Sequence, residues 1–186
     1  RLVGSEMCIR DRYHVMNAVA LIFILALDFL LRIPFQKTPT QEVKPYLLLP
    51  VKRNRIIDFL LIRSGLSLFN LFWLFLFVPF SFITITKFFG ISGVITYLIG
   101  ILLLIIANNY WYLLCRTLIN ERIWWVLLPI VFYGGIACLL FIPEDSPLFY
   151  FFMDLGDGYI QGNILCFLGT ILVLSLIHIS EPTRRS

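Results

Sequence analysis

A run without a single charged residue, residues 88–115, limits what this chain can fold into more than any other feature. A helix needs about 20 mostly apolar residues to cross a hydrocarbon core of about 30 Å. The chain of 186 residues is 60% hydrophobic and only 14% charged, with a mean hydropathy of +0.90. A soluble domain of this length needs a larger polar surface. The sequence therefore predicts an all-α fold, a polytopic transmembrane helical bundle.

The apolar residues gather into about five stretches that fit the length of a membrane-spanning helix. The last of them is cut short, so we expect an incomplete fragment of a longer membrane domain. The expected spans are residues 13–33, 64–86, 92–115, 123–143 and 158–174.

The two ends of the chain look foreign to the rest of the sequence. Residues 1–12 and 175–186 each resemble a peptide produced when sequencing-adapter DNA is translated. We therefore expect both ends to be non-native, the native domain to cover residues 13–174, and the true protein to continue beyond them. His178 lies in such an end and is not considered as a catalytic base.

The charges between the spans predict the orientation of the chain. Most charged residues of the segment 34–63 are basic, and basic residues occur again in 116–122. In contrast, Lys87 is the one charged residue of 87–92, and all charged residues of 143–158 are acidic. Segments rich in Lys and Arg stay on the cytoplasmic side of a membrane. We therefore expect 34–63 and 116–122 to be cytoplasmic loops, and 87–92 and 143–158 to be extracytoplasmic loops.

A few polar residues interrupt the apolar runs. Asp28 and Arg32 are four residues apart, so their side chains can meet on one helix face. They form either a structural pair near the cytoplasmic surface or part of a transport path, since ionisable groups in membranes are costly. Asn70, and Asn108 with Asn109, should face other helices, for interhelical hydrogen bonds or for substrate contact.

The segment before the second span concentrates the positive charge. Pro50 suits the first turn of a helix, and Lys52, Arg53 and Arg55 follow it closely. Cations are unfavourable at a helix N-terminus because of the helix dipole. Local helix chemistry therefore does not explain these charges. Topology explains them, and so would docking to a partner protein or to anionic lipid.

Motifs of soluble catalysis and metal binding are missing from the sequence. It contains no G-x-x-x-x-G-K-[ST], no H-E-x-x-H and no G-x-S-x-G, so we expect no enzyme, no cofactor and no P-loop ATPase within this chain. The four cysteines are far apart and form no C-x-x-C pair, so neither a metal site nor a disulfide framework is expected. Because the basic residues lie between apolar stretches, nucleic acid is not an expected partner.

Two segments resemble a known family. Residues 36–67 and 110–121 are similar to an uncharacterised bacterial family that resembles the membrane subunits of ABC-2-type transporters. In such permeases a leucine-proline-basic segment follows the second span and contains a short cytoplasmic coupling helix. The residues that match this pattern are Leu49, Pro50, Lys52, Arg53 and Arg55.

The resemblance implies a permease of the bacterial inner membrane that is driven by a separate ATP-binding cassette subunit, and it allows a homodimer. It also implies that residues 13–33 correspond to the family's second span. The alternative is a membrane assembly or scaffold protein that transports nothing. An intramembrane enzyme is the weaker alternative, because it needs a nucleophile and base or metal ligands at membrane depth.

Overall fold

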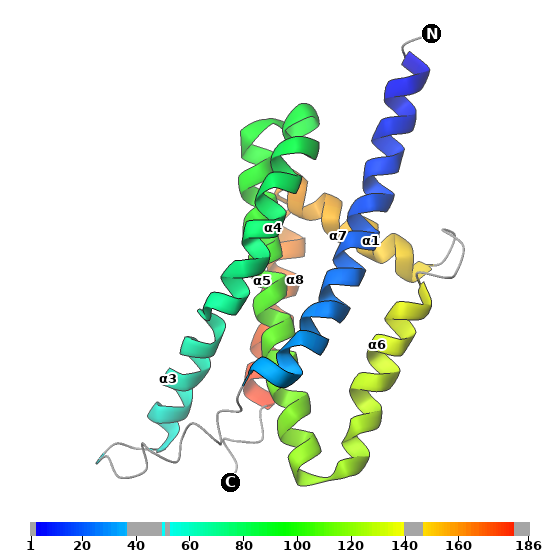
Figure 1. Ribbon diagram of the computed structural model, residues 1–186. Coiled ribbons are helices and arrows are strands. Elements are labelled where there is room, and N and C mark those ends of the chain that lie inside the picture. Colours follow the sequence, from blue (N-terminus) through cyan, green and yellow to red (C-terminus); the bar gives the residue numbers. More distant parts are fainter. Residues whose placement is uncertain (1–2, 37–49, 51–52, 140–146, 181–186) are drawn as a thin grey trace.

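The computed structural model describes residues 3–36, 50, 53–139 and 147–180, and these segments are almost entirely helical (Figure 1). No strand occurs among them, which confirms the predicted all-α fold. The helices are α1 (Val3–Phe35), α3 (Arg53–Gly65), α4 (Leu68–Thr84), α5 (Thr86–Glu121), the short 3-10 helix η2 (Ile123–Val126), α6 (Leu127–Leu139), α7 (Pro147–Gln161) and α8 (Ile164–Ser180).

Three stretches of the described residues are long and apolar enough to cross a membrane: His14–Phe35, Asp58–Thr84 and Phe89–Glu121. A fourth crossing is formed if α7 and α8 count together as one bent span. Many large apolar side chains also lie on the outside, such as Phe75 and Leu165, which are 80% and 75% exposed. An apolar exterior of this extent suits lipid rather than water. The chain is a membrane protein.

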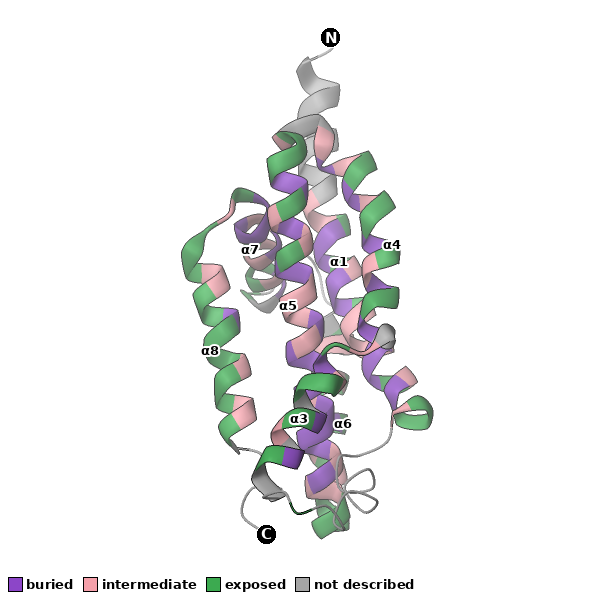
Figure 2. Cartoon of the chain, turned by 90° about the vertical axis from the view of Figure 1, so that its left-hand side faces the viewer, coloured by how far each residue is buried: buried purple, intermediate pink, exposed green. Residues whose placement is uncertain are grey.

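The long helix α5 is the centre of the bundle. It packs against α4, α7 and α8 most extensively, and against α1, α3 and η2 as well. Figure 2 shows buried residues along much of α5, whereas α8 is mainly exposed. Tyr97 and Ile101 of α5 are buried in the main core with Leu21 of α1, Trp73 of α4 and Tyr159 of α7.

The two ends of the bundle differ in composition. At the lower end in Figure 1, α1 and α5 finish and α3 and η2 begin. We call this the basic end, because Arg55, Arg63, Arg116 and Arg122 belong to it. The opposite end holds the corner between α4 and α5, together with α7. This arrangement brings residues of 34–63 and 116–122 to the same end, as the predicted orientation requires.

The prediction of a loop at 87–92 is wrong. The chain turns from α4 to α5 through helical residues, and the only break inside α5 is Gly90, with φ 71° and ψ −171°. A positive φ of this size is costly for residues other than glycine. Gly90 therefore allows a compact helical corner where the sequence suggested an open loop.

The segment 116–122 is likewise not a loop. α5 continues to Glu121 and ends only where Arg122 adopts an extended conformation, with φ −146° and ψ 125°. The charges of Arg116 and Glu121 do not stop a helix, and residues 116–122 contain no glycine or proline. In the segment 34–63, α1 reaches Phe35 and α3 begins at Arg53, so a helix lies within this segment as expected, while residues 37–49, 51 and 52 lie outside the described part.

The prediction of a loop at 143–158 is also wrong, because residues from Pro147 onward form α7. Pro is favourable in the first helical turn. α7 runs across the bundle and packs on α1 and α5, with Phe149, Tyr159 and Ile160 buried (Figure 1). Four acidic residues gave the segment the composition of a loop, but its apolar residues gather on one helical face.

A sharp bend replaces the predicted span at 158–174. Helices α7 and α8 meet at an angle of 114°, and Gly162 lies at the break with φ 68°. α8 therefore starts at Ile164 and continues to Ser180. The predicted span at 123–143 is shorter than expected, since its helical part covers Ile123–Cys138 and residues 140–146 lie outside the described part.

Helices α1 and α8 extend into the terminal segments that look foreign. α1 begins at Val3 and its first turns project beyond the other helices (Figure 1), and α8 ends at Ser180. Helical geometry does not depend on the origin of a sequence, so the foreign origin of both ends stays a prediction.

Candidate functional site: a buried polar network

Asp28 and Arg32 form an ion pair inside the bundle. They lie one turn apart on α1, and Arg32 Nε donates a hydrogen bond to Asp28 Oδ2 at 2.8 Å. Asp28 is 1% exposed and Arg32 is 0% exposed. Charges removed from water in this way are tolerated only when they are paired and further hydrogen-bonded.

The rest of the Arg32 guanidinium binds three amide side chains. Nη1 donates to Asn109 Oδ1 at 2.8 Å and to Gln36 Oε1 at 2.9 Å, and Nη2 donates to Asn70 Oδ1 at 2.6 Å. The planar donor fork of arginine thus finds acceptors inside the bundle.

The Asp28 carboxylate is held from the other side. Trp73 Nε1 of α4 donates to its Oδ1 at 2.6 Å, and Asn108 Nδ2 of α5 donates to its Oδ2 at 2.7 Å. Asn108 Oδ1 in turn accepts a hydrogen bond from the hydroxyl of Tyr133 on α6 at 2.5 Å. The carboxylate therefore connects three helices and, through Asn108, reaches a fourth.

The junction between α3 and α4 belongs to the same network. Ser64 Oγ accepts hydrogen bonds from Gln36 Nε2 at 2.8 Å and from Asn109 Nδ2 at 3.2 Å. Asn70 Nδ2 donates to the carbonyl of Gly65 at 2.6 Å. The last turn of α3 is thus fixed to the end of α1 and to α5 through polar contacts.

We call this set the Arg32 network: Asp28, Arg32, Gln36, Ser64, Asn70, Trp73, Asn108, Asn109 and Tyr133. The sequence singled out Asp28, Arg32, Asn70, Asn108 and Asn109, and the structure brings all five together. The expectation that the asparagines face other helices is confirmed, since Asn70, Asn108 and Asn109 are buried and bonded across helices. A transport role for any of them stays a prediction.

Four members of the network were not singled out from the sequence. Gln36 lies in the segment interpreted as a loop, and Ser64 is the first residue of the predicted span 64–86. Trp73 and Tyr133 are common types in membrane helices. A signal existed for Trp73 only: its indole N–H needs an acceptor when the residue is buried in an apolar run.

Three of the residues expected to couple to an ATPase, Pro50, Arg53 and Arg55, lie at the basic end. Arg55 is exposed in the first turn of α3, and Pro50 is exposed and lies outside this helix. The helix was predicted to start at Pro50, but α3 begins at Arg53. Lys52 lies outside the described residues, and so do residues 37–49.

A smaller polar group lies toward the opposite end. His14 Nδ1 lies 2.6 Å from Asp157 Oδ1, which joins α1 to α7. Tyr97 donates to Asn17 Oδ1 at 2.6 Å, and both side chains are buried. Among the described residues, no three His, Cys, Asp or Glu side chains lie close enough together to hold a metal ion.

Comparison with known proteins identifies one family. Residues 2–183 match the model of a family described as "Family of unknown function (DUF5687)", and the match extends into both terminal segments. No curated protein matches the chain, and no solved structure matches it either.

Proposed function

We propose that this chain, which belongs to the DUF5687 family of unknown function, is the membrane-spanning permease subunit of an ABC-2-type transporter. It moves its substrate with the energy of a separate ATP-binding subunit. The protein lies in the bacterial inner membrane, with its basic end in the cytoplasm. A second copy of the chain could complete the translocation path.

One observation carries this proposal: the first turn of α3 lies at the exposed basic end, whereas its last turn contacts the buried Arg32 network. Near its first turn, Arg55 is exposed at the basic end, where a cytoplasmic partner has access. At its last turn, Ser64 accepts hydrogen bonds from Gln36 and Asn109 of the Arg32 network. A single helix thus links a positively charged surface to the buried ion pair.

This connection provides a physical route for energy coupling. α3 is a helix of 13 residues, so it moves as a rigid rod of about 20 Å. A displacement of its basic end changes the position of Ser64 relative to α1 and α5. A hydrogen bond is lost when its donor and acceptor move apart by a few tenths of an ångström to an ångström. A displacement of α3 would therefore switch the buried network from one set of hydrogen bonds to another instead of shifting it gradually.

The positive charge of α3 supports a protein partner of negative charge. Cations in the first turns of a helix oppose its dipole, which costs up to about 1 kcal/mol each at exposed sites. An acidic groove on an ATPase would offset this cost when the two proteins associate. Orientation by the positive-inside rule needs positive charge but no particular helical position.

The test is co-purification of the full-length protein with ATP-binding cassette proteins of its own cell. We expect Arg53→Glu together with Arg55→Glu to abolish association. Arg122→Glu is the matched control, since Arg122 is exposed at the same end but follows α5. If the double variant retains the ATPase as well as the control does, α3 is not the docking segment.

A second variant separates docking from coupling. Ser64→Ala removes the acceptor of Gln36 and Asn109 but leaves the basic turn intact. We expect normal association and a weaker response of ATP hydrolysis in the reconstituted complex. Failure of the wild-type protein to associate with any ATP-binding subunit would favour the scaffold alternative.

A further inference from the structure

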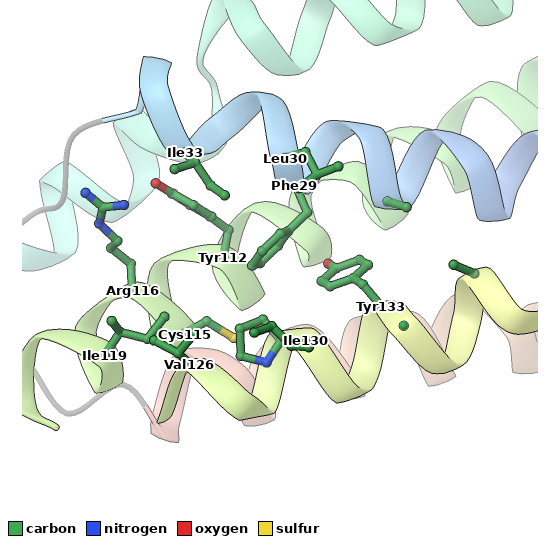
Figure 3. A pocket seen from close by; sticks show the side chains of 14 residues that line it. Phe29, Leu30, Ile33, Tyr112, Cys115, Arg116, Ile119, Val126, Ile130 and Tyr133 are labelled. Atoms are coloured by element: carbon green, nitrogen blue, oxygen red, sulfur yellow. The ribbon is translucent and has the colours of Figure 1, made fainter. Parts of the chain in front are cut away.

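A cavity of about 430 Å³ lies between α1, the last turns of α5 and α6. Figure 3 shows Phe29 and Tyr133 on one side of it, with Arg116 at the other. Its walls are almost wholly apolar and include Cys115, Ile119 and Ile130. Ligand cavities of about 300–1,000 Å³ hold molecules of the size of a drug or a cofactor.

The cavity opens through the side of the bundle. Leu30 and Ile33 of α1 line it and are 60% and 44% exposed, and Ile130 of α6 is 59% exposed. Exposed apolar residues on a membrane-spanning helix face lipid tails. A molecule can therefore enter from the bilayer without crossing the bundle.

Arg116 is the only lining residue with a charge. It lies in the last turns of α5 at the basic end, and within the part of the chain that the structure describes it makes no hydrogen bond or ion pair. Trp124 follows closely and is 78% exposed, as expected for a residue at the membrane interface. Because the cavity wall is almost wholly apolar, Arg116 lines it with its aliphatic stem, and its guanidinium lies at the edge of the cavity, at headgroup level.

From this combination we propose that the cavity binds one anionic phospholipid from the leaflet at the basic end. One acyl chain lies among the apolar residues, and the phosphate binds Arg116. A neutral apolar ligand would offer no negative charge to the guanidinium of Arg116. A soluble anion would leave the apolar walls without a partner.

The site adjoins the Arg32 network through one side chain. Tyr133 lines the cavity with its ring, and its hydroxyl donates to Asn108, which binds Asp28. Phe29 packs against the same ring, with centroids 4.3 Å apart. An acyl chain in the cavity therefore supports Tyr133 in the position that completes the network. This inference does not depend on the proposed transport function.

The charge requirement is tested with purified full-length protein. Native mass spectrometry counts the phosphatidylglycerol and phosphatidylcholine molecules that stay bound in detergent. We expect phosphatidylglycerol to bind more tightly, and Arg116→Gln to weaken it about fivefold, the effect of one cation near the headgroups. Arg122→Gln is the matched control and should change nothing. Equal retention by Arg116→Gln and wild type would overturn the proposal.

The apolar requirement has its own pair of variants. Gly134 lines the cavity, whereas Gly135 does not, and a Cβ atom added at either position meets no atom within 4 Å. Gly134→Leu should fill the cavity and lower retention of phosphatidylglycerol, and Gly135→Leu should not. Both variants should remain folded, which the thermal unfolding midpoint checks.

A further arm separates a lipid from a free anion. Glycerophosphoglycerol carries the headgroup without acyl chains, and we expect it not to compete with phosphatidylglycerol. If it competes at equal concentration, or if Gly134→Leu and Gly135→Leu retain the lipid equally, the cavity is not a lipid site.

Discussion

The Asp28 carboxylate accepts hydrogen bonds from Arg32 on its own helix and from Trp73 on α4, so one buried anion fixes two spans. Arg32 complements it with acceptors on α4 and α5. The two charges therefore compensate each other through contacts within the protein. The following predictions test this arrangement and the packing around it.

Removing one partner of the ion pair should harm the protein more than removing both. Asp28→Leu or Arg32→Met leaves a buried charge without its partner, which costs about 3–5 kcal/mol. The double variant leaves no charge, so its loss should be smaller than either single loss. Thermal or denaturant unfolding in detergent measures the free energies. Additive losses in the double variant would mean that the pair does not act as a unit.

Tyr133 should contribute through its hydroxyl. Tyr133→Phe removes the donor to Asn108, at a cost of about 1 kcal/mol for a hydrogen bond with a buried partner. Tyr150→Phe is the matched control, since Tyr150 is 48% exposed. Unfolding midpoints of both variants provide the comparison, and equal midpoints would contradict the role given to the hydroxyl.

The close approach of α5 and α7 depends on Gly100. A Cβ atom at this position would lie 2.4 Å from Cγ of Tyr159, closer than atoms pack. Gly100→Ala should therefore destabilise the protein by about 1–3 kcal/mol, the cost of overpacking. Gly134→Ala meets nothing within 4 Å and should be neutral or slightly stabilising. A neutral Gly100→Ala would show that α7 does not pack on α5 as described.

The orientation can be tested by cysteine labelling. In a background without native cysteines, Arg55→Cys and Asp154→Cys place thiols at exposed positions on α3 and α7. Because basic segments stay in the cytoplasm, a membrane-impermeant thiol reagent should label Asp154→Cys in intact cells. Arg55→Cys should react only in inverted vesicles. The reverse pattern would invert the proposed topology.

The polar residues of the candidate site were largely predictable because polar groups in apolar runs are rare and costly. Asp28, Arg32, Asn70 and Asn108 stood out for this reason. Buried polar groups need hydrogen-bond partners, so these side chains are expected to bind one another. Their exact partners were not predictable, because the spacing along one helix does not reveal which neighbouring helix it faces. Gln36 and Ser64 were missed since they sit just beyond the apolar runs.

The connections were predicted less well than the spans. Charge served as the sign of a loop, but charged residues end no helix by themselves, as α5 shows up to Glu121. In α7, Asp157 approaches His14 and Asp154 is exposed, so acidic residues coexist with a buried apolar face. Two of the breaks between helices instead occur at Gly90 and Gly162, where φ is positive.

The ion pair has a consequence for how the protein enters the membrane. Both Asp28 and Arg32 belong to α1, one turn apart, so they neutralise each other within one helix, before α4 and α5 have been synthesised. The insertion machinery therefore receives α1 with no net charge in its apolar part. Partners on α4 and α5 join later and lock a helix that is already in the bilayer. A pair split between two helices would need both to arrive at once.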